Sequence, residues 1–158
     1  MAQGKSTDEK VVATNRLASH NYFLLDRFEA GLELLGTEVK SLRAGEANLR
    51  DSYAAIKDRQ AWLMNCHIAP YAAGGYSNHA PLRARRLLLH RQEIRKLFGK
   101  TREKGLTLVP LRIYFKRGRA KCEIALAKGK KIHDKRETIR RRAAEREVAE
   151  AMRRHKRS

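Results

Sequence analysis

The sequence predicts a mainly β protein with short helices and a basic C-terminal tail, and two observations carry this prediction. Between residues 28 and 127, apolar and polar residues alternate along several short segments, which is typical of half-buried antiparallel strands. From Lys128 to Ser158 there are thirteen Lys and Arg against five Asp and Glu, a net charge of +8, with few large apolar side chains. Short strands lose their exposed edges by closing on themselves, so we expect a closed antiparallel barrel of the OB-like type.

Three parts of the chain follow from this pattern. Residues 1–14 are polar and should form a flexible N-terminal arm, and residues 15–127 should form the barrel. Residues 128–158 cannot bury enough apolar surface to order themselves, so we expect a tail that is disordered when free and helical against a partner. Glu and Arg four residues apart, as at Glu137 and Arg141, favour that helix.

The first elements of the barrel are predicted within residues 28–45. Alternation over residues 28–34 predicts a strand. A short helix should then begin near Gly36 and end at Gly45, since Val39 and Leu42 would share its inner face.

Residues 53–57 and 61–68 predict a hairpin, closed by a turn at residues 58–60. Its second strand should direct four side chains into the core: Trp62, Met64, Cys66 and Ile68. Residues 70–81 contain two consecutive glycines between prolines and predict a loop.

The last elements before the tail are a helix and a second hairpin. Residues 91–104 predict a helix, because Ile94, Leu97 and Phe98 lie at the spacing of one helix face. Residues 106–127 predict the hairpin, with a turn at Arg117-Gly118. Two stripes should meet in the core: Val109, Leu111, Ile113 and Phe115 on one strand, and Cys122, Ile124 and Leu126 on the other. Pro110 should lie at an edge or a bulge, where its missing N–H does no harm.

Charge points to the class of partner. The 158 residues include 36 Lys and Arg against 17 Asp and Glu, a net charge of +19. Such an excess opposes compaction and is usually balanced by a polyanion. The chain has no run of 18 apolar residues and no basic segment with a large apolar face, so nucleic acid is favoured over membrane.

Sequence motifs for catalysis, metal or cofactor are not found. Gly99-Lys100-Thr101 resembles the end of a phosphate-binding loop, but position 94, where that motif needs Gly, is Ile. Cys66 and Cys122 are far apart and should be reduced core thiols. We therefore expect no enzyme, no metal and no cofactor. The polar N-terminus lacks a signal peptide, so we expect a cytoplasmic protein.

Basic clusters are the candidate binding elements. They lie at residues 83–86, 116–121 and 128–131. Any one of them is explained as a solvated surface run, but three on so basic a chain favour RNA contact. Tyr22 and Tyr114 either stack on unpaired bases or pack in the core.

Several stretches, in order and with consistent spacing over residues 15–136, resemble the SsrA-binding protein family (small protein B). They are Asn15-Arg16, His20-Asn21-Tyr22, Phe28 to Gly31, Gly36 to Gly45, Asn48-Leu49, Asp51 to Tyr53, His67-Ile68, Pro70-Tyr71, Arg86 to His90, Val109 to Leu111, Ala125 to Lys131 and His133 to Arg136. The runs Glu38 to Arg43 and Ala127 to Lys131 are the most specific.

The resemblance implies an OB-like barrel that binds the tRNA-like domain of transfer-messenger RNA, with one protein monomer per RNA. The pair would enter the A site of a stalled ribosome, with the tail helical in the empty mRNA channel. Translation would then switch to the RNA's reading frame, which tags the unfinished peptide during trans-translation.

The resemblance also implies site residues. RNA contacts fall on Asn15, Glu29 and Leu88, to which we add the polar, basic or aromatic residues Arg16, His20, Tyr22, Lys40, Arg43, Asn48 and Arg86. The ribosome-binding positions of the tail are Lys128, Lys130, Lys131, His133, Asp134, Lys135, Arg136 and Met152. Two roles stay open: Glu29 either accepts from RNA or forms a salt bridge in the barrel, and Leu88 either packs under a base or belongs to the core.

Two other functions share some of these features. A general ribosomal or ribosome-assembly RNA-binding protein would have the same basic surface and tail without needing a tRNA-like ligand. A nucleic-acid-processing enzyme would need acids, a metal or a nucleophile that the sequence does not place together.

Overall fold

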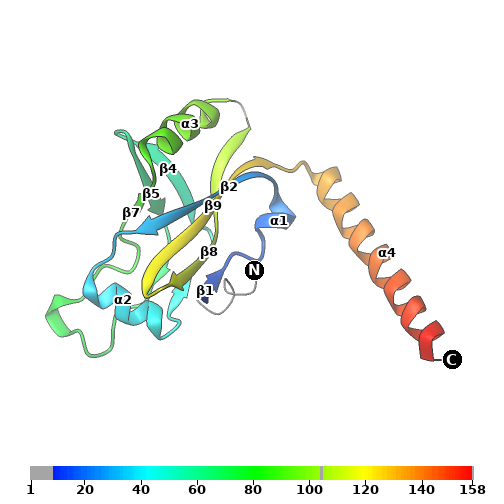
Figure 1. Cartoon of the computed structure of the whole chain (residues 1–158), viewed down its shortest axis with the longest axis horizontal. Helices are drawn as coiled ribbons and strands as arrows, with labels where there is room; N and C mark the ends of the chain where they lie inside the picture. Colours follow the sequence, from blue (N-terminus) through cyan, green and yellow to red (C-terminus); the bar gives the residue numbers. More distant parts are fainter. Residues whose placement is uncertain (1–8, 104, 158) are drawn as a thin grey trace.

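Seven strands form the main sheet of the protein, whose computed structural model describes residues 9–103 and 105–157. They are β1 (Glu9–Thr14), β2 (Tyr22–Leu32), β4 (Tyr53–Lys57), β5 (Gln60–Met64), β7 (Arg85–Leu88), β8 (Leu106–Lys116) and β9 (Arg119–Gly129). Their order is β1-β8-β4-β5-β7-β2-β9, the paired strands are antiparallel, and β9 also pairs with β8 (Figure 1). Two short strands, β3 (Ala47–Asn48) and β6 (His67–Ile68), pair separately.

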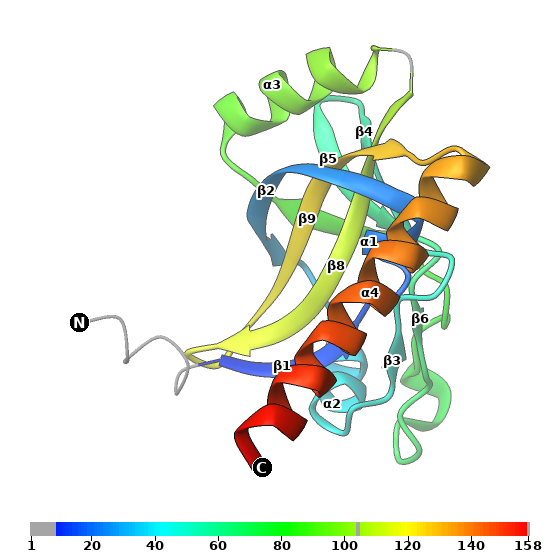
Figure 2. The same cartoon turned by 90° about the vertical axis from the view of Figure 1, so that its right-hand side faces the viewer.

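The helices lie around this sheet. They are α1 (Ala18–Asn21), α2 (Gly36–Arg43), α3 (Arg91–Thr101) and α4 (Ile132–Arg157), and a 3-10 turn at Gly75–Ser77 lies in the predicted loop. Figure 1 shows α3 and α2 at opposite ends of the sheet and α4 projecting from the body near α1. Figure 2, turned by 90°, shows the long axis of α4 running past α1. A mainly β protein with short helices is therefore confirmed.

The main core collects side chains from the strands and from two helices. Its fully buried members include Ala30, Leu42, Leu63, Leu87, Leu97, Ile113, Cys122 and Ile124. Leu42 lies inward from α2 as predicted, and the α3 residue Leu97 does the same. Cys66 and Cys122 are free, buried thiols, which confirms their predicted place in the core. Burial raises the pKa of Cys66 to about 11, so this thiol stays protonated at neutral pH.

The predicted flexible arm needs correction. Residues Glu9–Thr14 form β1, which pairs with β8 from Glu9 opposite Lys116 to Thr14 opposite Arg112. Polar residues are tolerated there because β1 is an edge strand with one solvated side. Residues 1–8 lie outside the described part of the chain.

The predicted inner face of the first hairpin is wrong in part. Ala61 and Leu63 are fully buried in β5, whereas Trp62 and Met64 are only half-buried. Asn65 has a left-handed backbone with φ of 58°, which interrupts the alternation along the strand. The inward-facing positions therefore change from odd to even residue numbers after Asn65. Cys66 and Ile68 lie in the core, as predicted.

A bulge divides the stripe predicted for β8. Pro110 pairs with Ile124 and Arg112 with Glu123, so Leu111 is the extra residue and Pro110 lies at a bulge, as predicted. Ile113 and Phe115 belong to the main core as expected. Val109 and Leu111 instead pack in a second cluster with Ala18, Ala125 and Ala127.

The tail has the helical form that was predicted for it. Residues 132–157 form the helix α4. Good helix formers such as Ala, Glu and Arg fill it, and Glu150 lies 3.6 Å from Arg154 one turn later. Its first turns also contact the body, because Thr138 is buried and Arg142 donates to the Ser19 hydroxyl at 3.3 Å.

Candidate RNA interface

The position of α2 is fixed by a buried ion network that sequence reasoning missed. Glu38 Oε2 accepts a hydrogen bond from Arg85 Nε, and Glu38 Oε1 accepts one from Arg83 Nη2, each at 2.6 Å. It also accepts the Leu35 backbone N–H at 2.8 Å and so caps the N-terminus of α2. The capping position of Glu38, two residues after Gly36, was the available sequence signal. The network ties α2 to residues 83–85 and so determines where its basic side chains lie.

Further polar contacts hold α2 against the loop before β7. Ser41 Oγ donates to Ala69 O at 2.7 Å. Thr37 Oγ1 lies 2.8 Å from His79 Nδ1, and Nε2 of this buried ring lies 2.9 Å from Ile68 O. A carbonyl only accepts, so Nε2 carries a proton, and in the neutral ring Nδ1 then accepts from the Thr37 hydroxyl.

Lys40 and Arg43 are exposed on the outer face of α2, as predicted. Lys40 Nζ lies 5.3 Å from the centre of the Tyr71 ring. The Arg43 guanidinium lies 4.6 Å from the centre of the Phe115 ring, and its Nη2 is 3.5 Å from Gly118 O. These ring contacts hold the charges at the surface without neutralising them.

Glu29 lies on the exposed face of β2 beside two residues of β8. The Tyr114 hydroxyl donates to its Oε2, and Lys116 Nζ lies 3.4 Å from the same atom. The hydrogen bond from Tyr114 lowers the pKa of Glu29 below its usual range, with help from Lys116 and against a smaller effect of burial. Glu29 is thus an ionised, 40% exposed carboxylate with one salt bridge, so the salt-bridge interpretation is correct, and its exposed surface leaves room for an RNA donor. Tyr114 itself is buried, which excludes it as a stacking platform.

Leu88 is 47% exposed at the end of β7, which excludes the core interpretation of this residue. It packs beside Gly31, where an added Cβ would come within 3.2 Å of the Leu88 Cβ. The two residues border a hollow of about 280 Å³, which Phe115, Arg119 and Lys121 also line. An apolar surface with cations at its rim is suited to an unstacked base and its phosphate.

A second group of predicted residues lies near the other end of β2. Asn15 Nδ2 donates to Pro110 O at 2.9 Å, so this amide holds the chain after β1 against β8. Tyr22 is half-buried against the second core cluster, which favours its packing interpretation. Asn15, Tyr22 and Arg50 line a small hollow of about 120 Å³. His20 lies on α1 nearby and is half-buried.

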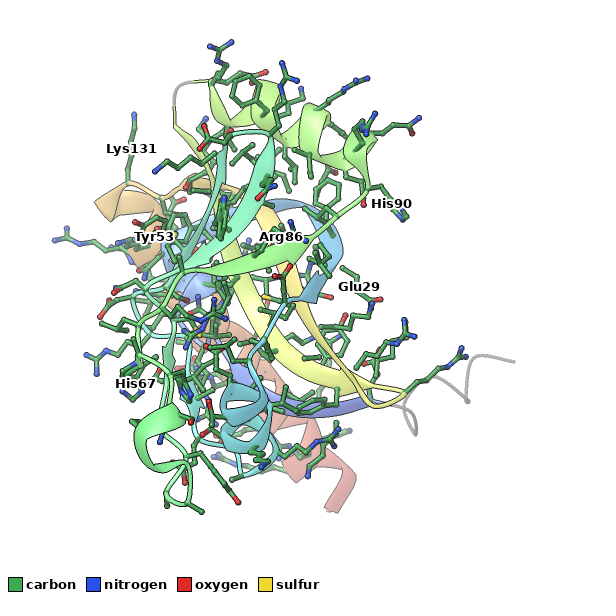
Figure 3. All side chains as sticks on the ribbon, turned by 90° about the vertical axis from the view of Figure 1, so that its left-hand side faces the viewer. Glu29, Tyr53, His67, Arg86, His90 and Lys131 are labelled. Carbon is green, nitrogen blue, oxygen red and sulfur yellow. The ribbon has the colours of Figure 1, made fainter. Side chains whose placement is uncertain are left out.

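The remaining predicted body residues are dispersed. Arg16 is exposed next to α1. The Asn48 side chain accepts the Arg50 backbone N–H at 2.8 Å. Arg86 pairs with Glu33 at 2.8 Å, and Figure 3 shows Arg86 on β7 and Glu29 on β2 from the same side of the molecule. The structure therefore brings Glu29, Leu88 and Arg43 to one end of β2, and Asn15, His20 and Tyr22 to the other.

Tail residues begin beside this second group. Lys130 Nζ donates to Ser19 O at 2.9 Å and to Thr138 Oγ1 at 3.1 Å, and lies 4.9 Å from the centre of the Phe23 ring. Lys128, Lys131, Arg136 and Met152 are exposed, and Lys135 is half-buried. His133 and Asp134 lie in α4, but their side chains are outside what the structure describes.

In residues 9–103 and 105–157, no group of three or more His, Cys, Asp or Glu is placed to hold a metal ion. None of the helices described is long and apolar enough to cross a membrane.

Known proteins are similar to this chain over nearly its whole length. The model of the SmpB protein family matches residues 12–154. The SsrA-binding protein of Desulforudis audaxviator is 61% identical over 145 residues, which is 92% of this chain and 95% of that protein. The SsrA-binding protein of Trichodesmium erythraeum is 55% identical over 156 residues, covering 98% and 100%. A solved chain from a structure described as tmRNA-SmpB at the center of the bacterial ribosome is 51% identical, with a TM-score of 0.65, covering 81% of this chain and 94% of that one.

Proposed function

The chain belongs to the SmpB protein family, and from that premise we propose that its strands hold the tRNA-like domain of transfer-messenger RNA while its tail enters the empty mRNA channel of a stalled ribosome. It binds transfer-messenger RNA and acts with it on the ribosome in trans-translation. The match over residues 12–154 carries this conclusion, and the net charge of +19 supports it physically.

The ring of strand pairings supports a closed, OB-like barrel as the RNA-binding body. β9 pairs with β2 on one side and with β8 on the other, and β8 pairs with β4. Such closure leaves few free edges and presents a rigid curved surface, a common basis for RNA recognition. The body then spans residues 15–127, with β1 added at the edge of β8.

The end of β2 around Glu29 and Leu88 is the part of this surface best suited to a base. Leu88 supplies exposed apolar area, and Arg43 and Lys121 supply positive charge for phosphate. The ionised Glu29 carboxylate is an acceptor for base N–H groups. Asn15 and His20 form the proposed second contact, with Asn15 acting mainly through the backbone that it holds and Tyr22 supporting the contact from the second core cluster.

The tail is proposed to act on the ribosome rather than on transfer-messenger RNA. Most of α4 is exposed and carries cations all round, as a segment surrounded by ribosomal RNA requires. Lys128, Lys131, Lys135 and Arg136 would contact phosphates, and His133 and Asp134 lie at its start. We place the protein in the cytoplasm, as a binding protein without catalytic activity.

A general ribosomal RNA-binding protein is the alternative, and competition separates the two. Labelled transfer-messenger RNA bound to the full chain is challenged with unlabelled transfer-messenger RNA or with bulk ribosomal RNA fragments at equal nucleotide concentration. We expect unlabelled transfer-messenger RNA, and not the ribosomal RNA fragments, to displace the labelled RNA. Equal displacement by ribosomal fragments would support the general RNA-binding protein.

A further inference from the structure

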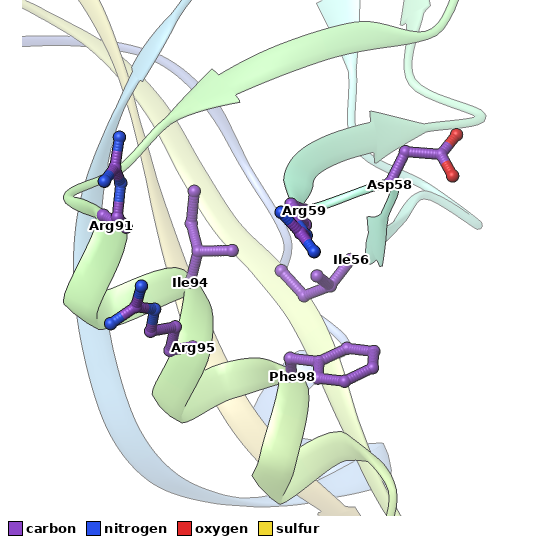
Figure 4. A pocket seen from close by; sticks show the side chains of 7 residues that line it. All are labelled: Ile56, Asp58, Arg59, Arg91, Ile94, Arg95 and Phe98. Atoms are coloured by element: carbon purple, nitrogen blue, oxygen red, sulfur yellow. The ribbon is translucent and has the colours of Figure 1, made fainter.

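A basic pocket lies between the β4–β5 turn and α3, on elements to which neither group of predicted RNA contacts belongs. Its volume is about 800 Å³, within the roughly 300–1,000 Å³ typical of small-ligand sites. Seven side chains line it, shown in Figure 4: Ile56, Asp58, Arg59, Arg91, Ile94, Arg95 and Phe98.

One face of α3 forms a wall of this pocket. Arg91, Ile94, Arg95 and Phe98 follow the spacing i, i+3, i+4, i+7 and share a face. Leu97 is fully buried and directs a different face into the core. Phe98 is 46% exposed, so its ring lies at the surface. Leu97 alone supplies the fully buried contact of α3 with the core, and Phe98 is not used for it. Figure 4 shows the ring directed across the pocket toward Ile56.

Among the described residues, the three guanidinium groups of the pocket have no acidic side chain paired with them. Of the residues described, none forms a recorded ion pair or hydrogen bond with the side chains of Arg59, Arg91 or Arg95. The carboxylate of Asp58 points away from α3 (Figure 4). Elsewhere in the protein arginines near acids do pair with them, as Arg86 does with Glu33. Three unpaired arginines around an apolar floor favour an anion attached to a flat apolar group.

The turn that carries Arg59 is held in an unusual backbone conformation. Asp58 and Arg59 have φ of 52° and 61°, where two-residue hairpin turns favour Asn-Gly. Glycine would relieve this strain but would remove the side chain that faces α3. Strained positions that keep a charged side chain often serve binding sites.

We infer that this pocket is a second RNA site, which takes a phosphodiester and one unstacked base of a single-stranded segment outside the tRNA-like domain. The inference rests on the proposed function, since it assumes an RNA-binding protein. The arginines bind the phosphate, and the base lies against Phe98, Ile94 and Ile56. Arg102 lies 4.6 Å from the centre of the Phe98 ring and already stacks on it, which leaves the opposite face for the base.

The experiment measures binding of a fluorescein-labelled oligouridylate of ten nucleotides to the full chain. The triple variant R59A/R91A/R95A should weaken this binding by roughly tenfold or more, and Phe98→Ala by roughly fivefold. A charge-matched control, K10A/R27A/K100A, removes three exposed cations that lie outside the pocket and outside the predicted RNA contacts, and it should weaken binding by less than about threefold if the pocket is specific. Circular dichroism melting checks the fold, and Arg95→Glu alone replaces the triple variant if that variant is unstable.

Three results would overturn the inference. The control variant could lose as much affinity as the pocket variant, which indicates diffuse charge. Polyglutamate of matched charge could displace the oligonucleotide as well as unlabelled oligouridylate does, which indicates an acidic protein partner. The pocket variant could lose affinity for the isolated tRNA-like domain, which makes the pocket part of the primary site. Failure of the unmodified chain to bind that domain would instead contradict the proposed function.

Discussion

Glu38 and Arg85 form an ion pair in which both side chains are fully buried, with 2.6 Å between Arg85 Nε and Glu38 Oε2. The pair joins the first turn of α2 to the start of β7. Arg83 adds a second, partly exposed cation to the same carboxylate. The elements that present Arg43 and Leu88 are therefore connected through one buried carboxylate.

Replacing Glu38 by Ala should cost about 3–5 kcal/mol of unfolding free energy, because Arg85 is left as an uncompensated buried charge. Chemical denaturation of the two proteins measures the difference. Glu103→Ala is the matched control, since Glu103 pairs with Lys100 at an exposed site and should change stability by less than about 1 kcal/mol. Equal losses for both variants would contradict a structural role for the network.

Acid should destabilise the protein through the same residue. Burial alone would raise the pKa of Glu38, but hydrogen bonds from Arg83, the Leu35 N–H and Arg85 prevail and lower it. A lowered folded-state pKa adds stability above the ordinary value of 4.5, and this stability is lost as pH falls through the folded-state pKa. Stability measured from pH 6 downward should fall more steeply for the unmodified chain than for Glu38→Gln. Parallel curves would show that Glu38 is not the titrating group.

Leu88→Ala should weaken binding of transfer-messenger RNA while leaving the melting temperature nearly unchanged, because Leu88 is 47% exposed. Leu63→Ala is the opposite control: Leu63 is fully buried, so truncation should cost about 2–5 kcal/mol of stability. Affinity and melting temperature are measured on each variant. If Leu88→Ala binds the RNA as well as the unmodified chain, its role in the interface is wrong.

A chain truncated after Gly129 should keep most of its affinity for transfer-messenger RNA yet fail to support peptide tagging on stalled ribosomes. The truncation removes α4 and the contacts of Lys130 and Arg142 with Ser19, but leaves the main core complete. Joint replacement of Asp134, Lys135 and Arg136 by Ala should have the same effect. Loss of transfer-messenger RNA binding on truncation would show that the tail belongs to the primary RNA site. If the truncated chain still supports peptide tagging, the tail contributes only general electrostatic attraction.

Local patterns in the sequence predicted most of the strands and helices, because alternation and helical spacing depend on near neighbours. The phase change at Asn65 and the bulge at Leu111 depend on backbone conformation, which hydrophobic alternation does not encode. β1 was missed for a different reason: its pairing with β8 joins residues about 100 positions apart. The buried ion pairs of Glu38 were not predicted, because its partners, Arg83 and Arg85, come from a distant segment.

The candidate site was predictable to a lesser degree. Exposure of Leu88 and burial of Tyr114 could not be known without the sheet, since both lie in apolar alternating segments. The basic pocket at α3 joins a hairpin turn to a helix more than 30 residues later, so neither segment alone indicates it.

Recognition of a tRNA-shaped RNA by this protein is tested most directly by the affinity of the full chain for the tRNA-like domain of transfer-messenger RNA at increasing salt. If Z phosphates are neutralised, log K should fall with log salt at a slope of roughly −0.7Z to −0.9Z. At physiological salt the tRNA-like domain should still bind far more tightly than random RNA of the same length. A slope near zero, or equal affinity for the two RNAs, would contradict the account.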